Sequence, residues 1–196
     1  MSEQKQYLRF SVARRIEHWV NFLAFFLLAF TGLPQKYPNS EISAWIFGLF
    51  GGLETVRIVH RGAAVALMLI VIWHAGKALH HWLVLRGPLS MLLTKDDAVN
   101  AYKAVRYNLK MSDEKPRQGF YTFEEKAEYY ALLWGTVVMI VTGFCLWNPI
   151  TASNWFPGGW IPAAKAAHGG EALLAVLAII LWHFYHVLVK HFNTSM

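Results

Sequence analysis

The chain has 196 residues, of which 56% are hydrophobic and only 15% are charged. Soluble domains carry roughly 25% charged residues, so this deficit indicates a lipid environment, and the length favours one domain. The net charge is +6, but its distribution follows membrane topology and does not form the basic patch that nucleic acid requires. The single cysteine, Cys145, excludes an internal disulfide, a four-cysteine zinc site and an iron–sulfur cluster held by this chain alone. Covalent c-type haem attachment is excluded because C-x-x-C-H is absent.

Four segments are apolar and long enough to cross a bilayer as helices, which takes about 20 residues. They cover approximately residues 16–33, 58–85, 129–147 and 166–188. Pro34 and Pro149 follow the first and third segments, and we expect each proline to end its helix. No small-residue cleavage site follows the first segment, so we interpret it as a retained span. The sequence therefore predicts an all-α integral membrane four-helix bundle in a single domain, 1–196.

Lysine and arginine concentrate before the first span and between the second and third spans. The positive-inside rule therefore places both termini and the linker 86–128 in the cytoplasm. Two stretches outside the spans, 40–53 on the outer side and 96–109 in the linker, could form short interfacial helices.

The first and third spans share a pattern. Glu17 lies fifteen residues before Gly32, Glu128 lies fifteen residues before Gly143, and a threonine precedes each glycine. Each span leads through an outer connection into a helix with one histidine near its outer end and a second about one leaflet deeper. This pattern indicates a tandem duplication of a helix hairpin, with chance similarity between apolar helices as the alternative.

Histidines are rare inside a bilayer and usually functional. The step from His168 to His183 is fifteen residues, about 22 Å of rise and about 60° of rotation in an α-helix. The step from His60 to His74 is fourteen residues, about 21 Å and about 40°. Each helix therefore carries two imidazoles on roughly one face. Two haems stacked across a membrane need this arrangement, and two histidines per iron leave no open position, which favours electron transfer.

The outer haem has one plausible pair of ligands, His60 with His168. For the inner haem, His183 is the ligand from the fourth span, and its partner is either His18 or His74. A bare metal ion is disfavoured because its ligands would cluster at one depth.

Several short motifs then resemble one family. They are RIEHW at 15–19, TGLP at 31–34, RIVHR at 57–61, HGGEA at 168–172 and WHFY at 182–185. Together they resemble the dihaem cytochrome b subunit of membrane-bound formate dehydrogenases and nickel–iron hydrogenases, with their thiosulfate-reductase relatives, over nearly the whole chain. The resemblance implies a multi-pass protein of the bacterial cytoplasmic (inner) membrane with two haems b. It also implies that His18 pairs with His183, and His60 with His168.

The chain departs from the family pattern in two places. His74 is an additional histidine, and the separation from His168 to His183 is one residue longer. His74 could replace His18, serve a quinone site, or hold a third haem together with His186, which lies five whole turns after His168.

The resemblance also implies a quinone site on the cytoplasmic side, near the inner haem and the start of the third span. The matching stretch is 121–128, YTFEEKAE. A carboxylate or imidazole with access to the cytoplasm suits the proton uptake of quinone reduction. The candidates for binding menaquinone or ubiquinone, or for moving its protons, are Tyr121, Lys126, Glu128, Glu17 and His74. Alternatively, the charged residues at 124–126 only cap and solvate the helix start.

We therefore expect a membrane subunit of a respiratory oxidoreductase, with no dehydrogenase chemistry of its own. It would pass electrons between a quinone at the cytoplasmic face and an iron–sulfur or multihaem cytochrome subunit docked outside on loops 35–56 and 148–165. Two alternatives belong to other classes, a haem-free membrane anchor and a proton-conducting transporter. The anchor leaves the paired histidines unexplained, and the transporter needs a polar path through spans that hold few mid-depth carboxylates.

Overall fold

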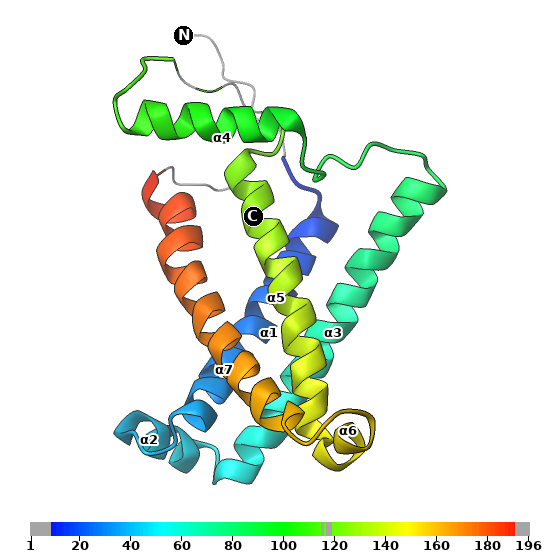
Figure 1. Cartoon of the computed structure of the whole chain (residues 1–196), viewed down its shortest axis with the longest axis vertical. Helices are drawn as coiled ribbons and strands as arrows, with labels where there is room; N and C mark the ends of the chain where they lie inside the picture. The colour runs from blue at the N-terminus through cyan, green and yellow to red at the C-terminus, as the bar shows by residue number, and fades with distance from the viewer. Residues whose placement is uncertain (1–8, 115, 117–118, 191–196) are drawn as a thin grey trace. The chain divides into compact units, whose positions relative to one another are not determined.

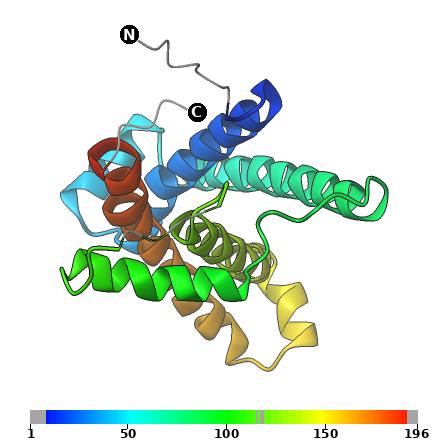
Figure 2. The same ribbon diagram turned by 90° about the horizontal axis from the view of Figure 1, so that it is seen from above.

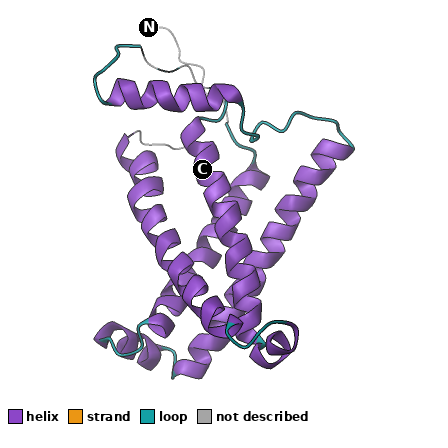
Figure 3. Cartoon of the chain, viewed as in Figure 1, coloured by secondary structure: helices purple, strands orange, loops and turns teal. Residues whose placement is uncertain are grey.

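The structure is a computed structural model that describes residues 9–114, 116 and 119–190. Every secondary-structure element in those residues is helical (Figure 3), which confirms the all-α fold class. In chain order, as labelled in Figure 1, the α-helices are α1 Val12–Lys36, α2 Glu41–Leu49, α3 Leu53–Leu83, α4 Lys95–Asn108, α5 Phe123–Trp147, α6 Pro149–Trp155 and α7 Trp160–Ala178. Two π-helical segments follow, η1 Ile179–His183 and η2 Tyr185–Lys190.

Among the described residues, four helices are long and apolar enough to cross a membrane, as the sequence predicted. They are α1, α3, α5 and the continuous run Trp160–Val189. At most 17% of the most apolar window of any of them is buried inside the protein. An apolar helix that buries so little of itself against protein needs lipid around it, so the chain is an integral membrane protein.

The chain divides into two compact units. Unit 1 comprises the described residues of Met1–His74 and Val138–Met196, and unit 2 comprises Ala75–Val137. Unit 1 therefore holds α1, α2, α6, α7, both π segments, the first part of α3 and the last part of α5. Unit 2 holds the end of α3, the linker, α4 and the first part of α5. The single-domain assignment stays a prediction.

The helix ends show how the prolines act. Pro34 lies inside α1, which continues to Lys36, so the prediction that Pro34 ends this helix is wrong. A proline near a helix end removes only its own N–H, and the amide of Tyr37 still closes the last turn on Leu33 O at 2.9 Å. Pro149 begins α6, where the missing N–H costs no helical bond.

Both short helices predicted outside the spans form, as α2 and α4. The seven-residue α6 was not predicted, and it lies at the same end of unit 1 as α2 (Figure 1). Ser40 begins α2 in the usual way, because its hydroxyl accepts a hydrogen bond from the Ser43 amide at 3.1 Å.

Small side chains bring the helices of unit 1 together. Helix α1 packs against α2 and α7, and α6 packs against α7 (Figure 2). Cys145, Ala152 and Ala164 form one buried cluster, and Val56 and Thr31 are fully buried. Lipid tails are as apolar as leucine, so helices in a membrane gain from close contact through small residues rather than from burying large ones.

The fourth span changes from α to π geometry at Ile179. A π turn runs from i to i+5, so it holds an additional residue, and such turns are rare outside functional sites. The rotation calculated for His183 assumed a regular α-helix and is therefore wrong, because His183 lies in η1.

In unit 2, a largely buried ion pair ties α4 to the start of α5. Lys126 donates hydrogen bonds to Asp97 Oδ2 at 2.8 Å and to Leu92 O at 3.0 Å. The two charged side chains are 9% and 12% exposed. Asp97 Oδ2 also accepts from the Thr94 amide at 2.7 Å and hydroxyl at 2.8 Å, as the acidic residue of a capping box does. The hydrogen bond from Lys126, followed by those from Thr94, lowers the pKa of the Asp97 carboxyl.

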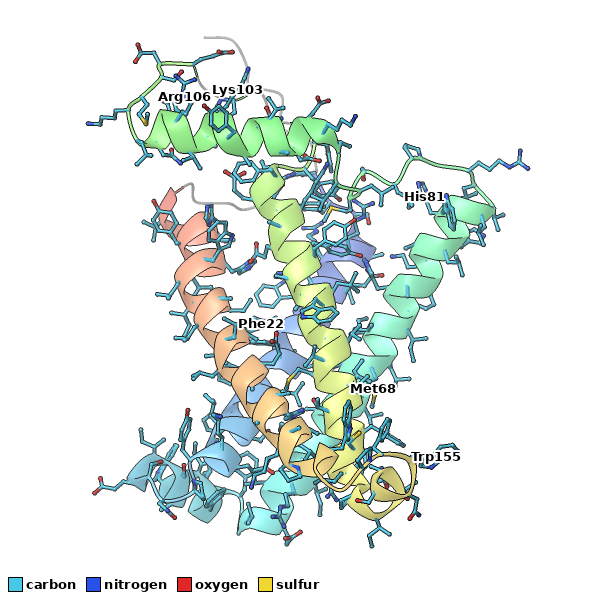
Figure 4. All side chains as sticks on the ribbon, viewed as in Figure 1. Phe22, Met68, His81, Lys103, Arg106 and Trp155 are labelled. Atoms are coloured by element: carbon cyan, nitrogen blue, oxygen red, sulfur yellow. The ribbon has the colours of Figure 1, made fainter. Side chains whose placement is uncertain are left out.

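Two basic side chains of α4 have partners within unit 2. Lys103 and Arg106 both lie on α4 (Figure 4). Lys103 Nζ donates to Glu114 Oε1 at 3.3 Å, and the Arg106 guanidinium lies 5.8 Å from the ring centroid of Tyr102. The basic charge of this helix is therefore partly neutralised within unit 2.

We predict that acid loosens α4 through Asp97. Because the native pKa of this carboxyl is lowered, its stabilising effect is present above the unfolded value of about 3.9 and is lost as the pH falls through the native pKa. Hydrogen exchange of the α4 amides should therefore accelerate as the pH falls below about 4, after correction for intrinsic exchange. Asp97→Asn should show the loosened state already at neutral pH. The matched control is Asp96→Asn, which leaves the pair with Lys126 in place, and equal protection in the two variants would contradict this role.

Candidate functional site

The structure brings His60 and His168 together in unit 1. His60 lies on α3 and His168 on α7, and their ring centroids are 6.3 Å apart with an interplanar angle of 69°. Both side chains are half-buried. The sequence placed these two histidines at one depth, and the structure brings the two rings close together.

A second pair forms between His18 and His183. Their ring centroids are 6.2 Å apart and their planes are inclined by 30°. His18 comes from α1, and His183 comes from the π segment η1. The sequence left His18 and His74 open as the partner of His183. In the structure, the ring beside His183 is that of His18.

The separation of the rings in each pair is that of two imidazoles on one metal ion. An imidazole nitrogen binds a metal at about 2.0–2.1 Å, and the ring centroid lies about 1.1 Å behind that nitrogen, so two rings on opposite sides have centroids about 6.3 Å apart. The two pairs measure 6.3 and 6.2 Å. No group of three or more His, Cys, Asp or Glu side chains that could hold a bare ion occurs in the described part of the chain. Two imidazoles alone suit an iron whose other ligands come from a porphyrin.

Each histidine of the first pair contacts a threonine of another helix. His60 Nδ1 lies 2.9 Å from Thr31 Oγ1, and His168 Nδ1 lies 3.0 Å from Thr142 Oγ1. Both threonines are buried, with 0% and 7% exposure. The sequence singled out these threonines only as part of the repeat, although their identical placement before a glycine was a usable signal.

The glycines after the two threonines lie directly against the same rings. A Cβ atom on Gly32 would come within 3.0 Å of His60 Cε1, and one on Gly143 within 3.2 Å of His168 Cε1. Both distances are shorter than ordinary van der Waals contact. The Thr-Gly pairs of the two predicted repeats therefore make equivalent contacts, which supports the duplication.

His74 and His186, the candidates for a third haem, contact other groups. His74 Nδ1 lies 3.7 Å from Glu17 Oε2, and the other carboxylate oxygen of Glu17 accepts a hydrogen bond from Trp73 Nε1 at 2.9 Å. His186 Nδ1 lies 2.8 Å from the carbonyl of Trp182 in its own helix. A third haem on His74 and His186 stays a prediction.

Two of the proposed quinone residues line a cavity in unit 2. Tyr121 and Lys126 lie there with Asp97, and the cavity has a volume of about 510 Å³. Glu128 lies half-buried on α5 in the same unit, whereas Glu17 belongs to unit 1. Asp97 was missed from the sequence, because nothing local pairs it with a lysine 29 residues later.

The start of α5 has the acidic cap that the sequence left as an alternative. Glu125 Oε2 accepts from the Thr122 amide at 2.9 Å, and the Glu125 amide donates to Thr122 Oγ1 at 3.2 Å. This is a reciprocal capping box. Glu125 is therefore explained by the helix start, and Lys126 has a structural partner in Asp97.

Comparison with known proteins gives a consistent result. The family model of prokaryotic cytochrome b561 matches residues 9–195. The formate dehydrogenase cytochrome b556(fdo) subunit of Escherichia coli K12 is 27% identical over 200 residues, covering all of this chain and 86% of the relative. The nitrate-inducible formate dehydrogenase cytochrome b556(Fdn) subunit of the same strain is 24% identical, covering 94% of this chain and 79% of the relative. The formate dehydrogenase cytochrome b556 subunit of Haemophilus influenzae is 23% identical, with 94% and 72% covered. These matches confirm the resemblance drawn from the motifs.

We predict that an added methyl group at either glycine destabilises unit 1. In Gly32→Ala and Gly143→Ala the new Cβ would meet an imidazole at 3.0 or 3.2 Å, and such overpacking typically costs about 1–3 kcal/mol. The control is Gly48→Ala on α2, where a Cβ meets nothing within 4 Å. Thermal unfolding in detergent, followed by circular dichroism, measures the difference. An equal or higher midpoint for Gly32→Ala than for Gly48→Ala would contradict the close fit.

Proposed function

The chain belongs to the prokaryotic cytochrome b561 family, and from this premise we propose that it is the dihaem membrane subunit of a quinone-linked respiratory oxidoreductase. The observation that carries the proposal is the pair of facing histidine couples, each with the separation of two imidazoles on one iron. Membership of this family implies haem b. The two haems, the quinone and the partner are our inference.

We assign the four axial ligands to the two couples. His60 and His168 would hold the outer haem, and His18 and His183 the inner haem. When bound, haem b supplies one-electron redox chemistry. Each couple offers two imidazoles, which would hold a haem iron without leaving a position for oxygen, so the bound haem would serve electron transfer. Along the fourth span the two levels are fifteen residues apart, which suits transfer of electrons across much of a bilayer.

The distribution of charge supports an orientation in the bacterial inner membrane with both termini in the cytoplasm. The linker between α3 and α5 carries seven lysines and arginines, which the positive-inside rule assigns to the cytoplasm. The level of His60 and His168 then lies toward the outer side, at the end of unit 1 that carries α2 and α6.

We place the docking surface for the partner subunit at that outer end. Loops 35–56 and 148–165 contain α2 and α6. Their exposed side chains include Ile42, Trp45, Ile150 and Trp155 (Figure 4 labels Trp155). The relatives are named as subunits of formate dehydrogenases, so we propose an iron–sulfur subunit of a formate dehydrogenase-type complex as the partner. A multihaem cytochrome would use the same surface.

On the cytoplasmic side we propose that menaquinone or ubiquinone is reduced to its quinol, or that the quinol is oxidised in the reverse reaction. Reduction takes two electrons and two protons, and the protons come from the cytoplasm. The cavity of unit 2 has the size of a small-molecule site and holds a phenol and an amine, Tyr121 and Lys126. Glu128 and Glu17 are carboxylates that could move the protons.

The haem content tests the proposal. We expect about two haems per chain in the purified protein and about one in His60→Ala, His168→Ala, His18→Ala and His183→Ala, because each variant loses one axial ligand. The control is His74→Ala, which should keep about two. A pyridine haemochrome assay counts haem, and reduced-minus-oxidised spectra identify the b-type band.

The outcomes separate the alternatives. Wild-type protein without haem would leave the anchor or the transporter as the function. Full haem content in His18→Ala together with loss in His74→Ala would show that His74 holds the inner haem.

We further predict that the carboxylates affect quinone turnover without affecting haem content. Glu128→Gln and Glu17→Gln should each slow haem reduction by a quinol analogue by about 100-fold where the carboxylate moves a proton. Tyr121→Phe and Lys126→Met should raise the quinol concentration needed for half-maximal rate. The control is Glu171→Gln, which removes the same charge from α7 near His168. Stopped-flow absorbance measures the rates, and unchanged kinetics in all four variants would remove these residues from the quinone site.

A further inference from the structure

The threonines beside His60 and His168 are arranged as hydrogen-bond acceptors. Each hydroxyl has a single proton, and each lies 2.6 Å from a carbonyl oxygen one turn earlier in its own helix, Leu27 O for Thr31 and Val138 O for Thr142. The proton of the hydroxyl is therefore donated to that carbonyl. The oxygen lone pairs remain for the imidazole Nδ1 at 2.9 and 3.0 Å.

A hydrogen-bond acceptor beside Nδ1 determines which ring nitrogen carries the proton. The proton of a neutral imidazole must then lie on Nδ1, so that Nδ1–H donates to the threonine. The other nitrogen, Nε2, keeps its lone pair and can bind a metal. A hydrogen bond from the far nitrogen of a metal-bound histidine also raises the basicity of the ligand, and hydrogen bonding around the iron is one of the levers that set the potential of a haem.

We propose that Thr31 and Thr142 are positioning residues of the outer haem, which fix the Nε2-binding tautomer of His60 and His168 and lower the reduction potential of that haem. This inference rests on the proposed function. The oxidised iron carries more positive charge than the reduced iron, so a more basic ligand favours it. Removing the acceptors therefore raises the potential.

The two threonines come from different helices and contact different histidines of one pair. Thr31 comes from α1 and contacts the histidine of α3, whereas Thr142 comes from α5 and contacts the histidine of α7. Their effects should therefore fall on the same haem and combine. The inner haem provides a reference potential within the same molecule, because the threonines are too far away to affect it. His18 lies thirteen residues from Thr31 along α1, which is about 20 Å.

The test compares valine with serine at both positions. Thr→Val keeps the shape of the side chain and removes the hydroxyl, whereas Thr→Ser keeps the hydroxyl and removes a methyl group. A redox titration of the intact protein, followed by the b-type absorbance, resolves the two haems. At a fixed ambient potential, we expect Thr31→Val and Thr142→Val each to raise the reduced-to-oxidised ratio of the outer haem by up to about tenfold, which is 59 mV for a one-electron couple. The double variant should shift further, and the inner haem should stay within about 10 mV of wild type.

The serine variants show whether the threonines act through the hydroxyl group or through the packing of the side chain. Wild-type behaviour of Thr31→Ser and Thr142→Ser supports the proposal, as does loss of the outer haem in the valine variants with retention in the serine variants. Equal shifts or equal haem loss in valine and serine variants would overturn it, and so would unmoved midpoints in both valine variants. A wild-type protein that binds no haem would instead refute the proposed function.

Discussion

An imidazole inside a bilayer needs a partner for each ring nitrogen, because lipid tails offer none. In unit 1 this requirement governs how the helices approach one another. Nδ1 of His60 and of His168 each contact a threonine on a different helix, and the centroids of the two rings are 6.3 Å apart. Thr31 reaches its histidine only because α1 and α3 come close, and Gly32 leaves the space for the ring. Helix contacts and ligand geometry are therefore one set of interactions.

The apparent duplication explains why this geometry occurs twice around one site. A hairpin that carries Thr-Gly on its first helix and histidine on its second provides one imidazole together with the partner for its Nδ1. Two such hairpins then bring two imidazoles together. The inner couple is built differently, because His18 comes from a first helix and His183 from a π segment. A π turn holds one residue more than an α turn, so it changes the direction in which the ring of His183 leaves the helix.

Unit 2 depends on an ion pair rather than on histidine contacts. Its central contact is the pair of Lys126 with Asp97, in which a largely buried amine is satisfied by a carboxylate and by a backbone carbonyl. A buried charge without such partners would be costly. The pair fixes α4 against the start of α5 and forms part of the wall of the cavity that contains Tyr121. Lys126 thus has a structural role beside the one proposed for it at the quinone site.

The sequence by itself determined the four spans, since about 20 apolar residues are needed wherever a helix crosses lipid. It also predicted two levels of histidines, because the rise of a helix converts residue number into depth, and it predicted α2 and α4. Only the tertiary structure decided that Thr31 and Thr142 contact His60 and His168, that His18 rather than His74 is the ring beside His183, and that Asp97 pairs with Lys126. These contacts depend on how helices rotate and approach one another. A local pattern sets depth and face, but the partner of a side chain is set by packing between segments far apart in the chain.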